Sequence, residues 1–129
     1  MPHAVAILCL APEGVPVVLD PRKPLPHYVK LPGGKGEGDE TPEQTAKREL
    51  KEETGIAVRE EDFALIDVQN RGTHEVFIFR VDVPNLNGLR ERGDEGEEVL
   101  VFAPDVLLER SDFFPPHRDA VQMTLIQSM

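Results

Sequence analysis

Short apolar runs separated by turn residues open the chain. Residues 4–10 and 15–19 are rich in Val, Ile and Leu, and the segment between them contains Pro and Gly. Runs of β-branched residues bounded by Pro and Gly are typical of strands. The pattern therefore predicts two strands that pair as a hairpin across residues 11–14.

Residues 41–54 carry the start and stop signals of one helix. Thr41 is a favourable N-cap, and Pro42 suits the first helical position because its ring presets the backbone angle. Gln44 completes a capping box with Thr41, and Gly55 follows the last helical residue. We therefore predict a single helix over this segment.

The rest of the chain alternates between predicted strands, loops and helices. Apolar residues occupy every second position from 77 to 83, which predicts a strand with one face in the core and with Arg80 and Asp82 on the other. The remaining predicted elements are an extended proline-rich loop at 20–32, strands at 64–68, 74–83 and 99–102, a mobile acidic loop or lid at 89–98, a helical turn at 104–109 and a helix at 117–127. This order predicts an α/β fold in which helices pack on the faces of a mixed sheet.

Length, charge and cysteine content restrict the class of function. The 129 residues are enough for one domain, over residues 1–129, and 24 acidic against 14 basic residues give a net charge of −10. Such a charge repels phosphate backbones and anionic lipids, so we expect neither a nucleic-acid nor a membrane partner. Cys9 has no second cysteine to pair with and apolar neighbours, and no export signal is visible. We expect a cytoplasmic protein with Cys9 in its core.

Three carboxylates share one side of the predicted helix. At about 100° per residue, Glu49, Glu52 and Glu53 fall within an arc of roughly 100°, beside the apolar stripe of Ala46 and Leu50. Like charges at this spacing repel, whereas a hard divalent cation that collects carboxylate oxygens turns the repulsion into attraction. The alternative is a solvated acidic face balanced by neighbouring Lys and Arg residues, and spacing alone does not separate the two.

A glycine-rich loop precedes the helix. Residues 33–38 contain four glycines, which leave backbone N–H and C=O groups free to approach a ligand, but they lack the Gly-Lys-Ser/Thr ending of a P-loop. Gly34 is followed after five residues by Glu40 and, after seven more, by residues 48–56, which read Arg-Glu-Leu-Lys-Glu-Glu-Thr-Gly-Ile. This spacing resembles the signature box of the Nudix hydrolases at every defining position.

The resemblance implies a fold, a metal and a reaction. Proteins of this family use an α/β/α sandwich with a mixed central sheet, and they use Mg²⁺ or Mn²⁺ to hydrolyse the diphosphate linkage between a nucleoside diphosphate and another group. Matching positions imply Glu49, Glu52 and Glu53 as metal ligands, with the Gly33 carbonyl as a further ligand. Arg48 would orient a helix glutamate by a charge-assisted hydrogen bond, or simply form an ordinary helical ion pair with Glu52.

Further acids lie outside the predicted helix. Glu40 precedes the N-cap, where a negative charge also favours the start of a helix, so its role is compatible with a purely structural one. The resemblance implies another glutamate on a loop before a late strand; Glu97 and Glu98 both qualify, and Glu98 is the predicted ligand. Among the four candidate bases, Glu52 is our preferred acceptor of the proton of water. The other three are Glu49, Glu53 and Glu98.

Substrate contacts are expected from basic and aromatic side chains, namely Arg22, Lys35, Tyr28 and Arg80. The residues beyond the box match no subclass marker, which leaves a nucleoside triphosphate, ADP-ribose and a nucleotide sugar as substrates. A non-catalytic sensor of nucleotide or ADP-ribose is the alternative function. An isomerase of allylic diphosphates would need an active-site cysteine, for which Cys9 is a poor substitute. We expect a small-molecule nucleotide as partner, and the sequence leaves a homodimer open.

Overall fold

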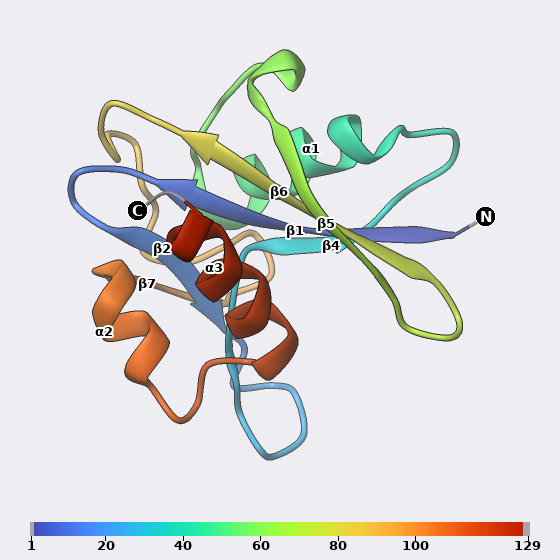
Figure 1. Ribbon diagram of the computed structural model, residues 1–129. Helices are drawn as coiled ribbons and strands as arrows, with labels where there is room; N and C mark the ends of the chain where they lie inside the picture. Colours follow the sequence, from blue (N-terminus) through green and yellow to red (C-terminus); the bar gives the residue numbers. More distant parts are fainter. Residues whose placement is uncertain (1, 128–129) are drawn as a thin grey trace.

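The computed structural model describes residues 2–127, which form seven strands, two longer helices and two short helical segments (Figure 1). In chain order the elements are β1 (His3–Leu10), β2 (Val15–Leu19), β3 (Val29–Lys30), β4 (Gly33–Lys35), α1 (Pro42–Thr54), the 3₁₀ turn η1 (Glu60–Asp62), β5 (Ala64–Asn70), β6 (Glu75–Asp82), β7 (Glu98–Phe102), α2 (Pro104–Glu109) and α3 (Pro115–Gln127). The predicted strands and helices are present, with β5 ending two residues later and α3 beginning two residues earlier than expected, while β3 and β4 lie in segments predicted as loops.

The strands form two sheets. The larger sheet has the order β4-β1-β6-β5, and in it β1 runs parallel to β6, with Val5 opposite Phe77, while the other neighbours are antiparallel. The smaller sheet, β3-β2-β7, is antiparallel throughout. The mixed sheet that the sequence predicts is confirmed, and a second sheet accompanies it.

The predicted hairpin between β1 and β2 is wrong, although both strands exist. Ala11 and Gly14 exchange backbone hydrogen bonds of 3.2 and 3.0 Å that close the turn, and beyond this turn the two strands enter different sheets. β6 pairs with β1 along its whole length, from His3 to Leu10, and β4 pairs with the other edge at Ala4, Val5 and Ala6. Pairing with a distant strand therefore replaces the local pairing that the short turn favoured.

Two clusters of buried apolar side chains fill the two sides of the larger sheet. One cluster packs Leu50 of α1 against Ile7 and Phe79. The other packs Ile78 against residues of the smaller sheet, α2 and α3, including Val121. Figure 1 shows α1 on one side of the larger sheet and the second sheet with α2 and α3 on the other. The layers confirm the α/β/α arrangement.

Burial of β6 differs from the expectation of one core face. Phe79 and Val81 face the cluster under α1, but Val76 and Ile78 are also buried, at 5% and 0% exposure, in the opposite cluster. The smaller sheet and α3 supply this second cover, which the period-2 pattern of a single strand does not reveal.

None of the helices within residues 2–127 has the length and apolar character needed to span a bilayer.

The helix that carries the acidic residues has the predicted ends. The Thr41 side chain accepts the N–H of Gln44 at 3.1 Å, and the Gln44 side chain accepts the N–H of Thr41 at 2.9 Å. At the other end Gly55 adopts φ 82°, a left-handed conformation that costs glycine little, and its N–H bonds the Lys51 carbonyl. Local sequence therefore fixes both ends of α1.

Candidate active site

The packed face of α1 sets the depth of its acidic residues. Ala46 and Leu50 are fully buried against the sheet, so the neighbouring Glu53 is drawn inward until only 9% of it is exposed. The Glu49 side chain is 14% exposed and the Glu52 side chain 42% exposed. The three carboxylates therefore run from the interior to the surface along one side of the helix.

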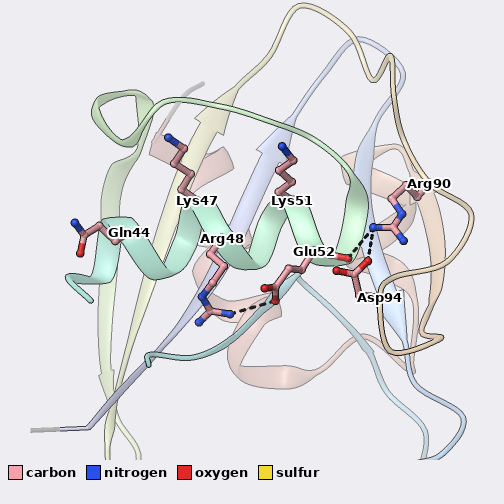
Figure 2. Close-up of a pocket in the computed structure, with 7 residues that line it drawn as sticks. All are labelled: Gln44, Lys47, Arg48, Lys51, Glu52, Arg90 and Asp94. Carbon is pink, nitrogen blue, oxygen red and sulfur yellow. Dashed lines mark hydrogen bonds and ion pairs between the residues drawn. The ribbon is translucent and has the colours of Figure 1, made fainter. Parts of the chain in front are cut away.

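Arg48 joins the acids of α1 to the glycine-rich loop. Its Nη1 donates to Glu49 Oε1 at 2.9 Å and to Glu52 Oε2 at 3.1 Å, and its Nη2 donates to the Lys35 carbonyl at 3.0 Å. The contact with Glu52 is visible in Figure 2. Both predicted alternatives for Arg48 coexist: it forms the helical ion pair with Glu52 and also orients Glu49.

Glu40 fixes the guanidinium of Arg48 from the far side. Arg48 Nε and Nη2 donate to its two oxygens at 2.7 and 3.0 Å, and the Thr45 hydroxyl and the Glu37 N–H also donate to it. The hydrogen bonds from Arg48 lead the effects that lower the pKa of Glu40 to about 2. A bidentate contact of this kind restricts the orientation of Arg48.

Burial and a neighbouring charge disfavour the ionised form of Glu53. Burial first, and then the charge of Glu49, raise the pKa of Glu53 to about 9, and burial likewise raises the pKa of Glu49. The N–H of Gly33 donates to Glu53 Oε2 at 3.3 Å, which offsets only part of this effect. Two crowded carboxylates in a partly desolvated position favour the arrival of a cation.

Two glycines of the loop allow its close approach to the acids. A Cβ on Gly33 would lie 2.0 Å from the Val5 carbonyl oxygen, and one on Gly34 would lie 2.6 Å from the carboxyl group of Glu49. No other residue fits at either position without displacing β1 or Glu49. The glycines therefore let β4 lie directly beside α1.

A cavity of about 890 Å³ opens over this cluster. Glu49, Glu52, Glu53 and Gly33 line one part of it, with Arg48 beside them. Its remaining lining residues are Val18, Asp20, Lys23, Pro24, Pro26, Tyr28, Lys30, Leu31, Gly34, Lys35, Glu37, Asp94, Glu95, Glu97 and Phe114. Acidic and basic side chains thus occupy one space large enough for a nucleotide.

Only some of the residues predicted to bind substrate line the cavity. Tyr28 and Lys35 line the cavity. Arg22 does not; it pairs with Asp20 at 2.9 Å and reaches Glu95 at 3.7 Å, both of which are lining residues. Arg80 lies on β6, does not line the cavity and bonds Asp82, so the structure does not bring this predicted substrate contact to the acids.

Glu97, rather than Glu98, reaches the cavity from the acidic loop. Glu97 is 8% exposed, and its charge contributes to the raised pKa of Glu53. Glu98 is exposed, opens β7 opposite Leu19 and is not a lining residue. Glu97 lies in the loop just before β7, where its side chain accepts the N–H of Glu95 at 3.0 Å. The structure therefore brings Glu97, and not the predicted Glu98, to the acids of the cavity.

Sequence reasoning missed Phe114 as part of the cavity wall. The rings of Tyr28 and Phe114 meet edge to face with centroids 5.4 Å apart, and Lys30 Nζ lies 4.8 Å from the centroid of Phe114. Backbone hydrogen bonds of 2.8 and 2.9 Å between Val29 and the segment before α3 bring these residues together. No local signal marks a contact between segments this far apart in sequence.

The donor set fits a hard divalent cation. Carboxylate oxygens surround the buried Glu53, and the adjoining Gly33 offers a backbone carbonyl, which are the ligand types that Mg²⁺ and Mn²⁺ prefer. Among residues 2–127, no three Asp, Glu, His or Cys side chains already converge in metal-binding geometry. Because Arg48 holds Glu49 and Glu52, binding requires these side chains to turn toward the cation.

Comparison with known proteins identifies the family. The sequence matches the model of the NUDIX domain over residues 1–123. An ADP-ribose pyrophosphatase from Bacillus subtilis (strain 168) is 34% identical over 110 residues, which are 84% of this chain and 60% of that protein. A dihydroneopterin triphosphate diphosphatase from Haemophilus influenzae (strain ATCC 51907 / DSM 11121 / KW20 / Rd) is 35% identical over 115 residues, 87% of this chain and 72% of that protein.

Solved structures agree on the fold. The MutT protein from Methanosarcina mazei Go1 superposes with a TM-score of 0.76 at 19% identity, over 98% of this chain and 94% of that one. The chain spans only 60% of the length of the Bacillus subtilis relative. With the family model covering residues 1–123 and an intact box of acids on α1, the chain belongs to the NUDIX domain family.

Proposed function

We propose that the protein is a divalent-metal-dependent hydrolase that cleaves a diphosphate linkage in a nucleoside diphosphate derivative. The observation that carries the proposal is the burial of Glu53, which is nine-tenths buried and crowded by Glu49 and Glu97 in the wall of a cavity. Folding alone does not favour such crowding, because each added charge raises the cost of ionising its neighbours. A bound cation would remove that cost.

The cavity offers separate groups for metal, phosphate and base. Glu49, Glu53 and Glu97 would hold the metal together with Glu52 and the Gly33 carbonyl. When bound, a divalent cation neutralises phosphate oxygens and makes water more acidic. Lys23, Lys30 and Lys35 line the same cavity and can bind phosphate oxygens, while the Tyr28–Phe114 pair offers aromatic surface to a nucleobase.

Glu52 is our choice for the group that takes the proton of the attacking water. It lines the cavity and is the most exposed of the three helix acids, at 42%, so water reaches it most readily. Its Oε2 accepts a hydrogen bond of 3.1 Å from Arg48 Nη1, which restricts the orientation of the carboxylate. Arg48 thereby acts on the reaction through Glu52.

Substrates named for the two relatives set the range to be tested. One is called an ADP-ribose pyrophosphatase and the other a dihydroneopterin triphosphate diphosphatase. For this chain we propose a nucleoside triphosphate, ADP-ribose or a nucleotide sugar as substrate. The complete set of acids around the cavity favours catalysis over the alternative, a sensor that only binds nucleotide.

The deciding experiment is a substrate panel with a matched pair of variants. Nucleoside triphosphates, ADP-ribose and nucleotide sugars are incubated with Mg²⁺, and phosphate and pyrophosphate are measured separately. Glu52→Gln should lower turnover at least about 100-fold, the range of general base catalysis, with an unchanged thermal midpoint. Glu43→Gln, an exposed change on the same helix outside the cavity, should retain turnover. Full activity of Glu52→Gln would refute its assignment, and wild-type binding without turnover would favour the sensor.

A further inference from the structure

The acidic loop between β6 and β7 is seated on the C-terminal end of α1. The N–H of Arg90 donates to the Thr54 carbonyl at 2.9 Å, and the N–H of Asp94 donates to the Glu52 carbonyl at 3.0 Å. These carbonyls belong to the last turn of the helix, where no partner exists within the helix itself. The loop therefore completes the end of the helix that carries the acids of the site.

The side chain of Arg90 joins the loop to the helix a second time. Its Nη1 donates to Asp94 Oδ1 within the loop and to the Glu52 carbonyl oxygen at 3.5 Å, as Figure 2 shows. Its methylene groups lie against Gly55, where a Cβ would be 2.7 Å from Arg90 Cγ. The guanidinium of Arg90 thus contacts both the loop and the helix, while its methylene groups pack against Gly55, the residue that ends α1.

The same loop brings Glu97 to Glu53. Gly93 lies so close to the helix that a Cβ there would be 3.2 Å from Glu53 Cα and 3.0 Å from Glu97 Oε1. The N–H of Gly93 donates to the Glu97 carbonyl at 2.9 Å, and the N–H of Glu95 donates to the Glu97 side chain at 3.0 Å. The position of Glu97 is therefore set by how firmly this loop lies on α1.

Negative charge concentrates where the loop and α1 meet. The loop contributes Asp94, Glu95 and Glu97, and α1 contributes Glu52 and Glu53 together with the partial negative charge of its C-terminal carbonyls. Arg90 is the cation that bonds both sides of this contact. Without it, repulsion between like charges would act against the two backbone hydrogen bonds that seat the loop on the helix.

We propose that Arg90 is a positioning residue that holds the Glu97 loop against the acids of α1 before metal binds. The proposal rests on the proposed function, since it assumes a divalent cation shared between Glu53 and Glu97. It predicts a specific defect: loss of the Arg90 charge weakens metal binding, and high metal concentration restores the site. A variant that merely misfolds would not be restored in this way.

The test compares Arg90→Gln with a control from the same loop. Arg92 Nη1 donates to the Gly96 carbonyl at 3.3 Å inside the loop, so Arg92→Gln removes an equal charge without detaching the loop from α1. Mn²⁺ binding to the substrate-free protein is followed by electron paramagnetic resonance of free Mn²⁺. Hydrogen exchange of the Asp94 amide is measured without metal, and the Mg²⁺ concentration giving half-maximal turnover is measured with substrate.

For Arg90→Gln we expect Mn²⁺ binding about fivefold weaker, the effect of losing one partly exposed ion pair. We also expect faster exchange of the Asp94 amide and turnover close to wild type at saturating Mg²⁺. Arg92→Gln should change Mn²⁺ binding less than twofold. In a Glu97→Gln background, Arg90→Gln should add nothing, because its partner in positioning is already lost.

Two results would overturn the positioning role. One is wild-type Mn²⁺ binding by Arg90→Gln; the other is an equal loss of binding with or without Glu97. If the wild type binds Mn²⁺ but hydrolyses no nucleotide, the proposed hydrolase is refuted while an Arg90 defect in Mn²⁺ binding still supports this inference. If the wild type binds no Mn²⁺ at all, both are refuted.

Discussion

Acidification should destabilise the protein through one buried histidine, His117. This side chain, 7% exposed, lies in the first turn of α3, and its Nδ1 accepts the N–H of Leu31 at 3.1 Å. Its ring meets Phe114 edge to face at 5.0 Å. Burial chiefly, with the charges of Arg71 and Lys30 as smaller causes, lowers the pKa of His117 to about 3. Protonation would both charge a buried ring and remove the acceptor that holds Leu31.

The sign and size of the effect follow from proton binding in the two states. An unfolded chain binds a proton at His117 below about pH 6.5, whereas the folded protein does so only near pH 3. Between these values the unfolded state holds more protons, so stability falls as pH falls, by about 1.4 kcal/mol per unit. At pH 5 the unfolded state has gained about 2 kcal/mol relative to pH 7.5.

Glu53 changes the pH dependence of stability in the opposite direction to His117, so the two contributions must be measured separately. Its raised pKa of about 9 means that the folded state keeps a proton which the unfolded chain releases above about pH 4.5, so its contribution to stability falls as pH rises. The wild-type profile alone therefore mixes two slopes. A difference between wild type and a His117 variant isolates the histidine, because Glu53 is present in both.

The assay is urea unfolding of wild type and His117→Asn at pH 7.5 and pH 5.0 in EDTA. The Asn side-chain oxygen can accept the Leu31 N–H in place of Nδ1 but does not titrate. The stability advantage of wild type over the variant should shrink by about 2 kcal/mol at pH 5.0. Val121→Ala, a buried change in the same helix, should give the same difference at both pH values. A wild-type advantage over His117→Asn that is unchanged between the two pH values would refute the reasoning.

Three further results follow from burial around the site. Leu50 is fully buried under α1, so Leu50→Ala should cost about 2–5 kcal/mol in urea unfolding, while Leu50→Met should cost less than about 1.5 kcal/mol. Because the pKa of Glu53 is about 9, binding of Mn²⁺ at pH 7.5 should release close to one proton from the protein. Calorimetry in two buffers with different ionisation enthalpies measures this proton release. The same proton release from the Glu53→Gln variant would contradict the prediction. Burial raises the pKa of Cys9 to about 12, so a thiol reagent should react with it only after unfolding.

The sequence predicted α1 and its acidic side well because the determinants are local. Thr41 and Gly55 fix the ends of the helix through hydrogen bonds to residues within four positions. Once the ends are fixed, helical periodicity alone places Glu49, Glu52 and Glu53 on one side. Packing of Leu50 then decides which of the three is buried, and that too follows from the same wheel.

Features that depend on distant segments could not be predicted in the same way. The pairing of β1 with β6 rather than β2 depends on a strand about seventy residues away in the sequence. Glu97 and Glu98 are adjacent, but Glu98 pairs with β2 while Glu97 is placed by the fold of the preceding loop, and sequence alone gives neither. Phe114 reaches the cavity through backbone bonds between Val29 and the segment before α3.

Charge links these two classes of feature. The local sequence places several acids on one side of α1. Two arginines lie beside them. Arg48 bonds Glu49 and Glu52, and Arg90 bonds Asp94 and the C-terminal end of the helix. Arg48 is also anchored by Glu40, which is not a lining residue, so a metal can draw Glu49 and Glu52 away without releasing the guanidinium. The folded chain thus tolerates an acidic cavity before metal arrives because two arginines, Arg48 and Arg90, place positive charge beside its acids.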